Sequence, residues 1–232
     1  MKVKDLPLDY TVSRSNRKTM ALYIRKDGGV EVRCPLHSRD PEIKKFVAEN
    51  MQWIEKKSAE MAGKAKKRAG FRLIPGCSLK LLGKDYRLTV SNNGMAGFDG
   101  TDFYVPAETP PETTKKLIIK IYKNLAERRL KTRTAEIAAA MKRQPVNVKI
   151  NAAKTRWGSC SGKNSINYSW RLIMAEERCI DYVIIHELAH MTERNHGKSF
   201  WALVKTYMPD YKEQEKKLKQ LQEKLSVENW ED

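Results

Sequence analysis

Three of the four histidines in this chain lie within eleven residues, in the segment HELAHMTERNH at positions 186–196. On a helix, His186 and His190 are separated by about 40° of rotation and about 6 Å of rise, so both imidazoles leave the same face. Two nitrogens in that arrangement can bind one zinc ion. Glu187 is turned too far to share the ion, but its carboxylate can reach a metal-bound water and take its proton. The spacing therefore predicts a Zn²⁺ site with Glu187 as the general base.

The third protein ligand requires a change of chain direction. A catalytic zinc usually binds three side chains and leaves one position for water. On a continuous helix, His196 would point about 240° away from His190. We therefore expect the helix that begins near residue 177 to end at about 193–195, so that the chain folds back and His196 completes the site. Asn195 and Gly197 favour such a turn because both tolerate left-handed backbone conformations.

Two roles in this site have more than one candidate in the sequence. A carboxylate on a later helix, Glu213 or Glu215, is the alternative to a third histidine ligand. Hydrolysis through a tetrahedral intermediate also needs a hydrogen-bond donor for the oxyanion. The upstream candidates for that donor are Arg156, Ser159 and Tyr168, and a structural role for each is an equally good explanation.

The pattern HExxH also arises by chance on buried helices. Here the apolar segment YVII precedes it, and the only other histidine in the chain is His37, which we expect in a loop or in the core. Both observations favour a metal site over packed histidines. Metzincins share the spacing HExxHxxxxxH but have glycine where this chain has Glu193, so the turn must be built differently.

The elements that position these residues can be read from hydrophobic periodicity. Residues 19–35 alternate around Asp27-Gly28-Gly29 and predict a hairpin. Asp40 is the expected cap of a helix over 41–62, whose inward face carries Ile43, Phe46, Val47, Asn50, Trp53 and Ile54. The basic segment 63–70 is the expected linker.

The remaining two thirds of the chain predicts further strands and four helices. Strands are expected at 78–90 and 102–106, and again at VNVKINA and SINYSWRLIMA on either side of TRWGSCSGKN. The expected helices are 110–143, with Leu117, Ile118, Ile121, Leu125, Ile137 and Met141 on its apolar face, then 177–193, 197–208 and 210–225. Strands and helices are segregated, which predicts an α+β fold. We expect domains at 1–70 and 71–232, or one continuous domain over 1–232.

Composition limits the class of protein and its partners. With 41% hydrophobic residues, no apolar leader and no apolar run long enough for a bilayer, we expect a cytoplasmic protein without a membrane partner. The four cysteines form no CxxC pair, which fits a reducing compartment. Of 45 basic residues, 32 lie in 1–150 with 16 acidic ones, so +16 of the net charge of +17 belongs to the N-terminal part. That part is the candidate surface for nucleic acid.

Long segments around the histidines resemble one known family. TRWGSCSGKNSINYSWRLIMA and IDYVIIHELAHMTERNHGKSFWALV look like the YgjP-like metallopeptidase family, which is related to the SprT and WLM zincin groups. The likeness extends to YTVSRSNRKTMALYIRKDGGVEVRCP, QWIEKK and LLGKDYRL. The resemblance implies a zincin-like fold, zinc ligands at His186, His190 and His196, and a catalytic acid/base at Glu187. It also implies that the strands at 156–160 and 167–172 lie beside the metal, where an edge strand can pair with an extended peptide.

Three functions are compatible with the sequence. The first is a zinc metallopeptidase acting on a peptide or protein. The second, an older label within the family, is a metal-dependent nucleotide pyrophosphatase; the chain has no glycine-rich phosphate loop, and such chemistry more often uses carboxylate-bound magnesium. The third is a DNA-associated protein with structural zinc, but such sites usually have four protein ligands and no free carboxylate like Glu187 beside them. The first is the leading prediction.

Overall fold

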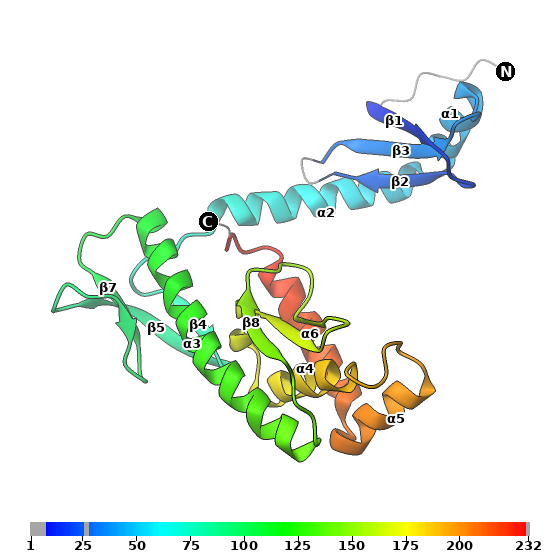
Figure 1. Ribbon diagram of the computed structural model, residues 1–232. Helices are drawn as coiled ribbons and strands as arrows, with labels where there is room; N and C mark the ends of the chain where they lie inside the picture. Colours follow the sequence, from blue (N-terminus) through cyan, green and yellow to red (C-terminus); the bar gives the residue numbers. More distant parts are fainter. Residues whose placement is uncertain (1–7, 26–27, 231–232) are drawn as a thin grey trace. The chain divides into compact units, whose positions relative to one another are not determined.

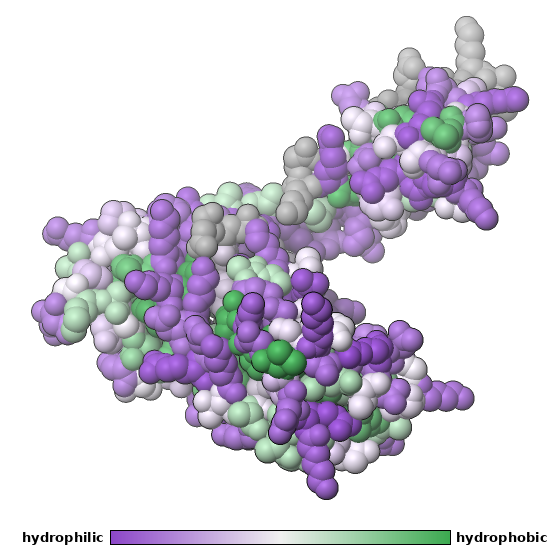
Figure 2. Space-filling view, in the orientation of Figure 1, coloured by the Kyte–Doolittle hydropathy of each residue, from purple (hydrophilic) through white to green (hydrophobic). Residues whose placement is uncertain are grey.

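The computed structural model describes residues 8–25 and 28–230, and the chain forms two compact units. The first unit contains the residues up to Phe71 together with Ser226–Asn229, and the second contains Arg72–Leu225 with Trp230. Both units mix helices and strands (Figure 1), so the predicted α+β class is confirmed. Hydrophilic side chains cover most of the face shown in Figure 2. None of the helices in the described ranges combines the length and hydrophobicity of a membrane span.

The first unit contains a three-stranded sheet in the order β1-β3-β2. The predicted hairpin is present as β2 (Ala21–Ile24) and β3 (Val30–Pro35), which pair antiparallel. Gly28 has φ of +86° at its turn, whereas Asp27 lies outside the described residues. Strand β1 (Tyr10–Ser15) pairs parallel to β3 and was not predicted, because YTVSRS contains too few apolar residues to show an alternation.

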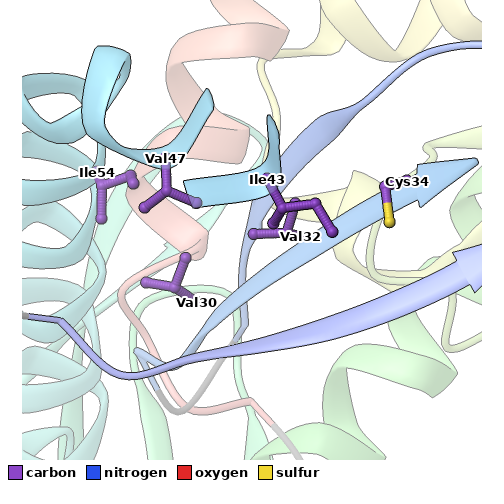
Figure 3. Packing of buried hydrophobic residues seen from close by; sticks show 6 residues of the cluster. All are labelled: Val30, Val32, Cys34, Ile43, Val47 and Ile54. Atoms are coloured by element: carbon purple, nitrogen blue, oxygen red, sulfur yellow. The ribbon is translucent and has the colours of Figure 1, made fainter. Parts of the chain in front are cut away.

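Two helices pack against this sheet and enclose a small core. Helix α1 (Asp40–Glu49) contacts β3, and α2 (Met51–Gly70) contacts β2. The side chains between them are aliphatic apart from one cysteine, and they lie close together in Figure 3. They are Val30, Val32, Cys34, Ile43, Val47 and Ile54. The apolar residues at helical spacing in α1 and α2 therefore face this local core.

The single helix predicted for 41–62 is wrong in three respects. The chain breaks at Asn50, whose side-chain amide donates a hydrogen bond to the Phe46 carbonyl at 2.8 Å in competition with the helical pattern. Trp53 follows the break and is 43% exposed instead of facing inward. The expected linker at 63–70 is helical, because its alanine, lysine and arginine residues are strong helix formers.

The start of α1 also differs from the prediction. Arg39, not Asp40, is the N-cap, and the Arg39 N–H donates to the Glu42 carboxylate at 3.0 Å. The carboxylate of Asp40 instead accepts a hydrogen bond from Arg14 at 2.5 Å. Glu42, in the first turn of the helix, thus accepts the backbone N–H of the N-cap residue, which is the part of a capping box that glutamate supplies.

The second unit begins with a four-stranded sheet in the order β4-β5-β7-β6. Its strands are β4 (Ser78–Leu81), β5 (Lys84–Ser91), β6 (Gly97–Phe98) and β7 (Phe103–Pro106). The long helix α3 (Pro111–Ala140) follows and contacts β6 and β7. The segments predicted as strands at 78–90 and 102–106 are therefore present, with a turn at Leu82-Gly83 dividing the first.

The buried face of α3 is rotated relative to the predicted one. Its fully buried side chains include Tyr122, Ala126, Leu130 and Thr134, which were not predicted, together with Ile118. Of the other predicted residues, Ile137 and Met141 are buried, whereas Leu117, Ile121 and Leu125 are only half-buried. Ala126 and Thr134 occupy the inner face, where neighbouring elements approach closely. A prediction based on large apolar residues alone therefore placed the buried face wrongly.

A second sheet in this unit has the order β8-β10-β9, which leaves β9 at an edge. Strand β10 (Ser165–Ser169) pairs parallel to β8 (Asn147–Asn151) and antiparallel to β9 (Gly158–Cys160). The strand predicted through SINYSWRLIMA ends early, since the Ser169 hydroxyl accepts the Arg171 N–H and caps a 3₁₀ helix, η1 (Trp170–Met174). The sequence WRLIM is therefore helical and buried.

Three helices complete the unit: α4 (Glu177–Ala189), α5 (Lys198–Tyr207) and α6 (Tyr211–Leu225). Helix α4 packs against α3, α5, α6 and β9. This explains its nearly continuous apolar sequence, because an apolar surface all round a helix requires neighbours on every side. The histidines lie at its carboxyl end, where the helix reaches the surface.

Candidate metal centre

Helix α4 ends at Ala189, between the first two histidines. His186 is in the last turn, and His190 is the C-cap. The next two residues, Met191 and Thr192, donate their N–H groups to carbonyls three residues back, and the Thr192 hydroxyl also bonds to the Ala189 carbonyl. These short-range bonds tighten the last turn and stop the helix about four residues before the predicted end at 193.

The chain then folds back and brings His196 to the other two histidines. This fold-back uses no left-handed residue: Asn195 has a negative φ, and Gly197 has φ of −77° and is the N-cap of α5. The expectation that these two residues turn the chain through left-handed conformations is therefore wrong. The Glu193 N–H, which bonds to the Ala189 carbonyl at 2.9 Å, begins the turn instead.

The three imidazoles converge on one point. The Nε2 atom of His196 lies 3.1 Å from Nε2 of His186 and 3.1 Å from Nε2 of His190. Two nitrogens bound to a tetrahedral zinc at 2.0–2.1 Å are about 3.3 Å apart, so this spacing fits the ion. In the described ranges, these histidines form the one group of three or more metal-binding side chains whose ligand atoms lie within 4.8 Å of one another.

The protonation of the rings also suits a metal. The Nδ1 atom of His190 faces the Glu193 carbonyl at 3.0 Å, so Nδ1 carries the proton and Nε2 presents its lone pair to the centre. Burial, followed by the nearby His190 and His196 rings, lowers the pKa of His186 to about 3. Burial also lowers the pKa of His190. Neutral imidazoles are the form that binds metal ions.

One aromatic side chain supports all three rings. Phe200, in the first turn of α5, is fully buried. Its ring centroid lies 4.9 Å from that of His186, 4.5 Å from that of His190 and 4.7 Å from that of His196. Phe200 therefore forms an apolar base that excludes water from one side of the histidines and limits their rotation.

A stack of rings extends from the third histidine to α6. Trp201 stacks on His196 with centroids 5.7 Å apart, and on Tyr211 with centroids 5.1 Å apart. Tyr211 in turn stacks on Tyr182, which contacts His186 edge to face. The stack ties the histidine that lies outside α4 back to the helix that carries the other two.

Glu187 lies beside the histidines in an apolar environment. Its side chain is 5% exposed, and burial raises its pKa to about 7, while Arg156 and a backbone hydrogen bond from Cys160 act in the opposite direction. Gly158 on β9 lies directly against the carboxylate. A carboxyl group with a pKa near 7 can both accept and donate a proton at neutral pH.

His186 and Glu187 open onto a groove of about 590 Å³. One wall is the segment that leads into β9, and the other is α6. The residues that line it are Thr155, Arg156, Trp157, Gly158, Tyr182, Val183, His186, Glu187, Glu215, Leu218, Lys219, Gln222 and Glu223. The groove thus has an apolar floor next to the histidines and charged side chains at its rim.

The carboxylates considered as alternative ligands lie outside the histidine group. Glu215 lines the groove, and Glu213 is largely exposed with Lys217 at 3.4 Å. Neither has a ligand atom within the 4.8 Å cluster. His37 lies in an exposed turn after β3 in the first unit.

The three candidates for an oxyanion donor have different environments. Arg156 is exposed and lines the groove with Glu187. Tyr168 is fully buried, its hydroxyl bonds to Thr134, and burial raises the pKa of Tyr168 far above its usual value. Ser159 is paired with Asn167 within the sheet.

Sequence reasoning missed several residues that shape this centre. Phe200 and Trp201 contact the histidines, and Gly158 contacts Glu187. Arg194 lies in the segment before His196 and bonds to the turn after β9. The pair FW, four residues after the third histidine, was the available signal for the aromatic side chains, because two adjacent aromatic residues in the first turn of a helix need a partner surface.

Comparisons with known proteins support a peptidase family. The family described as YgjP-like, metallopeptidase domain matches residues 18–221. Among solved structures, the chain is similar to the metallopeptidase zymogens abylysin of Pyrococcus abyssi and jannalysin of Methanocaldococcus jannaschii. Each is 26% identical with a TM-score of 0.36; the matches cover 38% of this chain and 90% of abylysin, and 39% of this chain and 94% of jannalysin. A search among curated proteins gave no match. The family match spans most of the sequence, and the chain belongs to the YgjP-like metallopeptidase domain family.

Proposed function

We propose that this protein is a zinc-dependent peptidase in which His186, His190 and His196 hold Zn²⁺ and Glu187 is the general base. The observation that carries the proposal is the convergence of three imidazoles beside a buried carboxyl group at one end of a groove. The donor set of three nitrogens with a free fourth position is that of catalytic zinc sites. When bound, zinc lowers the pKa of a coordinated water and polarises a carbonyl.

Glu187 supplies the proton transfers. Its carboxylate takes a proton from the attacking water and then delivers it to the departing amide nitrogen. Its environment supports this double role, because burial holds the pKa of Glu187 near neutrality. Gly158 lies directly against the carboxyl group, and Glu187 lines the same groove as His186.

The edge of the small sheet offers a place for the substrate backbone. Strand β9 pairs with β10 on one side only, and Trp157 and Gly158 line the groove. An extended peptide can add to such an edge through backbone hydrogen bonds. This arrangement favours a peptide over a compact nucleotide as the substrate.

Arg156 is the best candidate for stabilising the oxyanion. Its guanidinium is exposed in the same groove as Glu187 and carries a permanent positive charge. Tyr168 has no access to that groove because it is fully buried. A cation positioned where negative charge develops lowers the energy of the transition state.

The experiment that tests the function compares the zinc-loaded protein with Glu187→Gln on a labelled unfolded protein and a mixed peptide library. We expect cleavage by the parent, loss of cleavage with a chelator, recovery on adding zinc, and inactive E187Q that still binds zinc. A nucleotide panel assayed in parallel separates the alternative: chelator-sensitive nucleotide hydrolysis without peptide cleavage would replace the peptidase proposal. Full peptide cleavage by E187Q would remove Glu187 as the base.

A further inference from the structure

The segment that carries His196 depends on contacts outside helix α4. His186 and His190 are placed by the helix and its cap, whereas residues 191–197 form no regular element. The position of the third nitrogen is therefore set by whatever holds this segment, and we call residues 191–197 the ligand loop. Within the loop, the Glu193 carbonyl faces His190, and the Ser199 hydroxyl donates to the Glu193 carboxylate at 2.8 Å.

Arg194 anchors the ligand loop to the turn between β9 and β10. One terminal nitrogen, Nη1, donates to the Ser161 carbonyl at 3.0 Å. The other, Nη2, donates to the Asn164 side-chain oxygen at 2.8 Å and to the Gly162 carbonyl at 3.3 Å. One planar guanidinium thus bonds to three oxygens, a geometry that its fixed fork of donors favours.

The turn that receives Arg194 is itself well fixed. The Ser161 hydroxyl accepts the N–H groups of Lys163 and Ser165 at 3.3 and 3.1 Å, and the Ser161 carbonyl accepts the Asn164 N–H at 3.0 Å. Asn164 holds the left-handed conformation that closes the turn, with φ of +56°. Its carbonyl also accepts the Val146 N–H at 2.9 Å, which ties the turn to the start of β8. Arg194 therefore connects the ligand loop to a hydrogen-bonded support.

We propose that Arg194 is a positioning residue that sets the affinity of the site for zinc by holding His196 at the convergence point. The inference rests on the proposed zinc site and adds the device that fixes its third ligand. Arg194 acts through the loop, because the three oxygens that its terminal nitrogens bind belong to the turn at 161–164 and not to a histidine. The same bonds link the ligand loop to the turn that follows β9, the strand proposed to bind the substrate.

The test measures zinc dissociation constants by competition with a chromophoric chelator for Arg194→Ala, Arg194→Lys and Asn164→Gly. Loss of groups that orient metal ligands typically weakens metal binding by about 10- to 100-fold, and we expect that range for R194A. R194K, which replaces the fork by a single ammonium, and N164G, which removes one acceptor and tolerates the left-handed conformation, should weaken binding less. Faster zinc release from R194A should account for most of the change.

Arg178→Ala is the matched control. Arg178 is also exposed on the second unit and lies at the end of α4 opposite to the histidines. Its guanidinium also makes two hydrogen bonds, both to the Asp210 carboxylate. We expect R178A to bind zinc like the parent. Thermal unfolding of each metal-free variant separates loss of the fold from loss of the third ligand.

The outcomes distinguish this inference from the proposed function. If the parent binds zinc tightly and R194A remains within twofold of it, the positioning role is wrong while the zinc site stands. Equal weakening in R194A and R178A also overturns it, since the effect is then general destabilisation. If the parent binds no zinc under reconstitution, the proposed function itself fails.

Discussion

Gly158 lies so close to Glu187 that a side chain at this position would collide with the carboxyl group unless that group moved. A Cβ atom built on Gly158 would lie 2.6 Å from Oε1 and 2.8 Å from Cγ of Glu187. Real contacts of a Cβ are longer, so any larger residue must push the carboxylate away. The backbone of Gly158 is not in the left-handed region, and its glycine is therefore required for space alone.

Gly158→Ala should displace Glu187 and lower kcat for peptide cleavage by about 100-fold, the cost of misplacing a catalytic group by roughly 1 Å. Zinc content should stay at the level of the parent, because the histidines do not contact residue 158. Gly162→Ala is the control on the same hairpin, since a Cβ there has nothing within 4 Å. Steady-state kinetics and elemental analysis check both, and an unimpaired G158A would show that the carboxylate position is not critical.

Phe200→Ala should reduce both stability and zinc binding. The ring is fully buried beneath the three histidines, and truncating such a side chain costs about 3–5 kcal/mol of unfolding free energy. Phe200→Leu fills most of the volume and should lose less. Denaturant unfolding of the metal-free proteins and zinc competition measure the two effects; unchanged zinc affinity in a folded F200A would contradict the supporting role of the ring.

Burial of Glu187 predicts a pH dependence in the metal-free protein. Because the pKa is about 7 when folded and 4.5 when unfolded, the folded state holds a proton that the unfolded state releases over this range. The contribution of Glu187 to the free energy of unfolding should therefore fall as pH rises from 4.5 to 7, by on the order of 3 kcal/mol.

His186 has the opposite effect. Its pKa is about 3 in the folded state and 6.5 in the unfolded state, so its burial lowers the free energy of unfolding as pH falls below 6.5. Glu187→Gln removes only the carboxyl effect. The measurement is urea unfolding of the metal-free parent and E187Q between pH 4 and 8. Their stability difference should grow in favour of E187Q as pH rises, and a constant difference would contradict the burial of a neutral carboxyl group.

Arg156→Ala should lower kcat by about 10²- to 10³-fold with zinc content unchanged, the loss typical of removing one oxyanion donor. Arg156→Lys should recover part of the rate because it keeps a positive charge. Lys219→Ala, a cation of the same groove on α6, is the control and should affect KM more than kcat. A loss confined to KM in R156A would assign Arg156 to substrate binding instead.

The sequence predicted that the three histidines come together better than it predicted the residues that support them. The four-residue spacing of His186 and His190 follows directly from helical geometry, and the strands of the hairpin follow from their alternation. The end of α4 at Ala189 could not be predicted in this way, because the sequence there is compatible with a helix. The helix is stopped by short-range hydrogen bonds of Thr192. The contact of Gly158 with Glu187 joins residues from two elements and has no local signal.

The predictions for the helices were wrong where local helix propensity and tertiary packing disagree. Trp53 has the spacing of an inward residue, but the break at Asn50 shifts the phase of the second helix. Ala126 and Thr134 are buried on α3 because their neighbours come close, which hydrophobicity does not reveal. Such features arise from contacts distant in sequence.

The most direct test of the proposed three-histidine zinc centre is the zinc content and affinity of the purified parent, measured beside His196→Ala and E187Q. We expect one zinc per chain in the parent, a large loss of affinity in H196A, and near-parental binding in E187Q, because the carboxylate is not a ligand. Parental zinc affinity in H196A, or no zinc binding by the parent after reconstitution, would contradict the three-histidine centre.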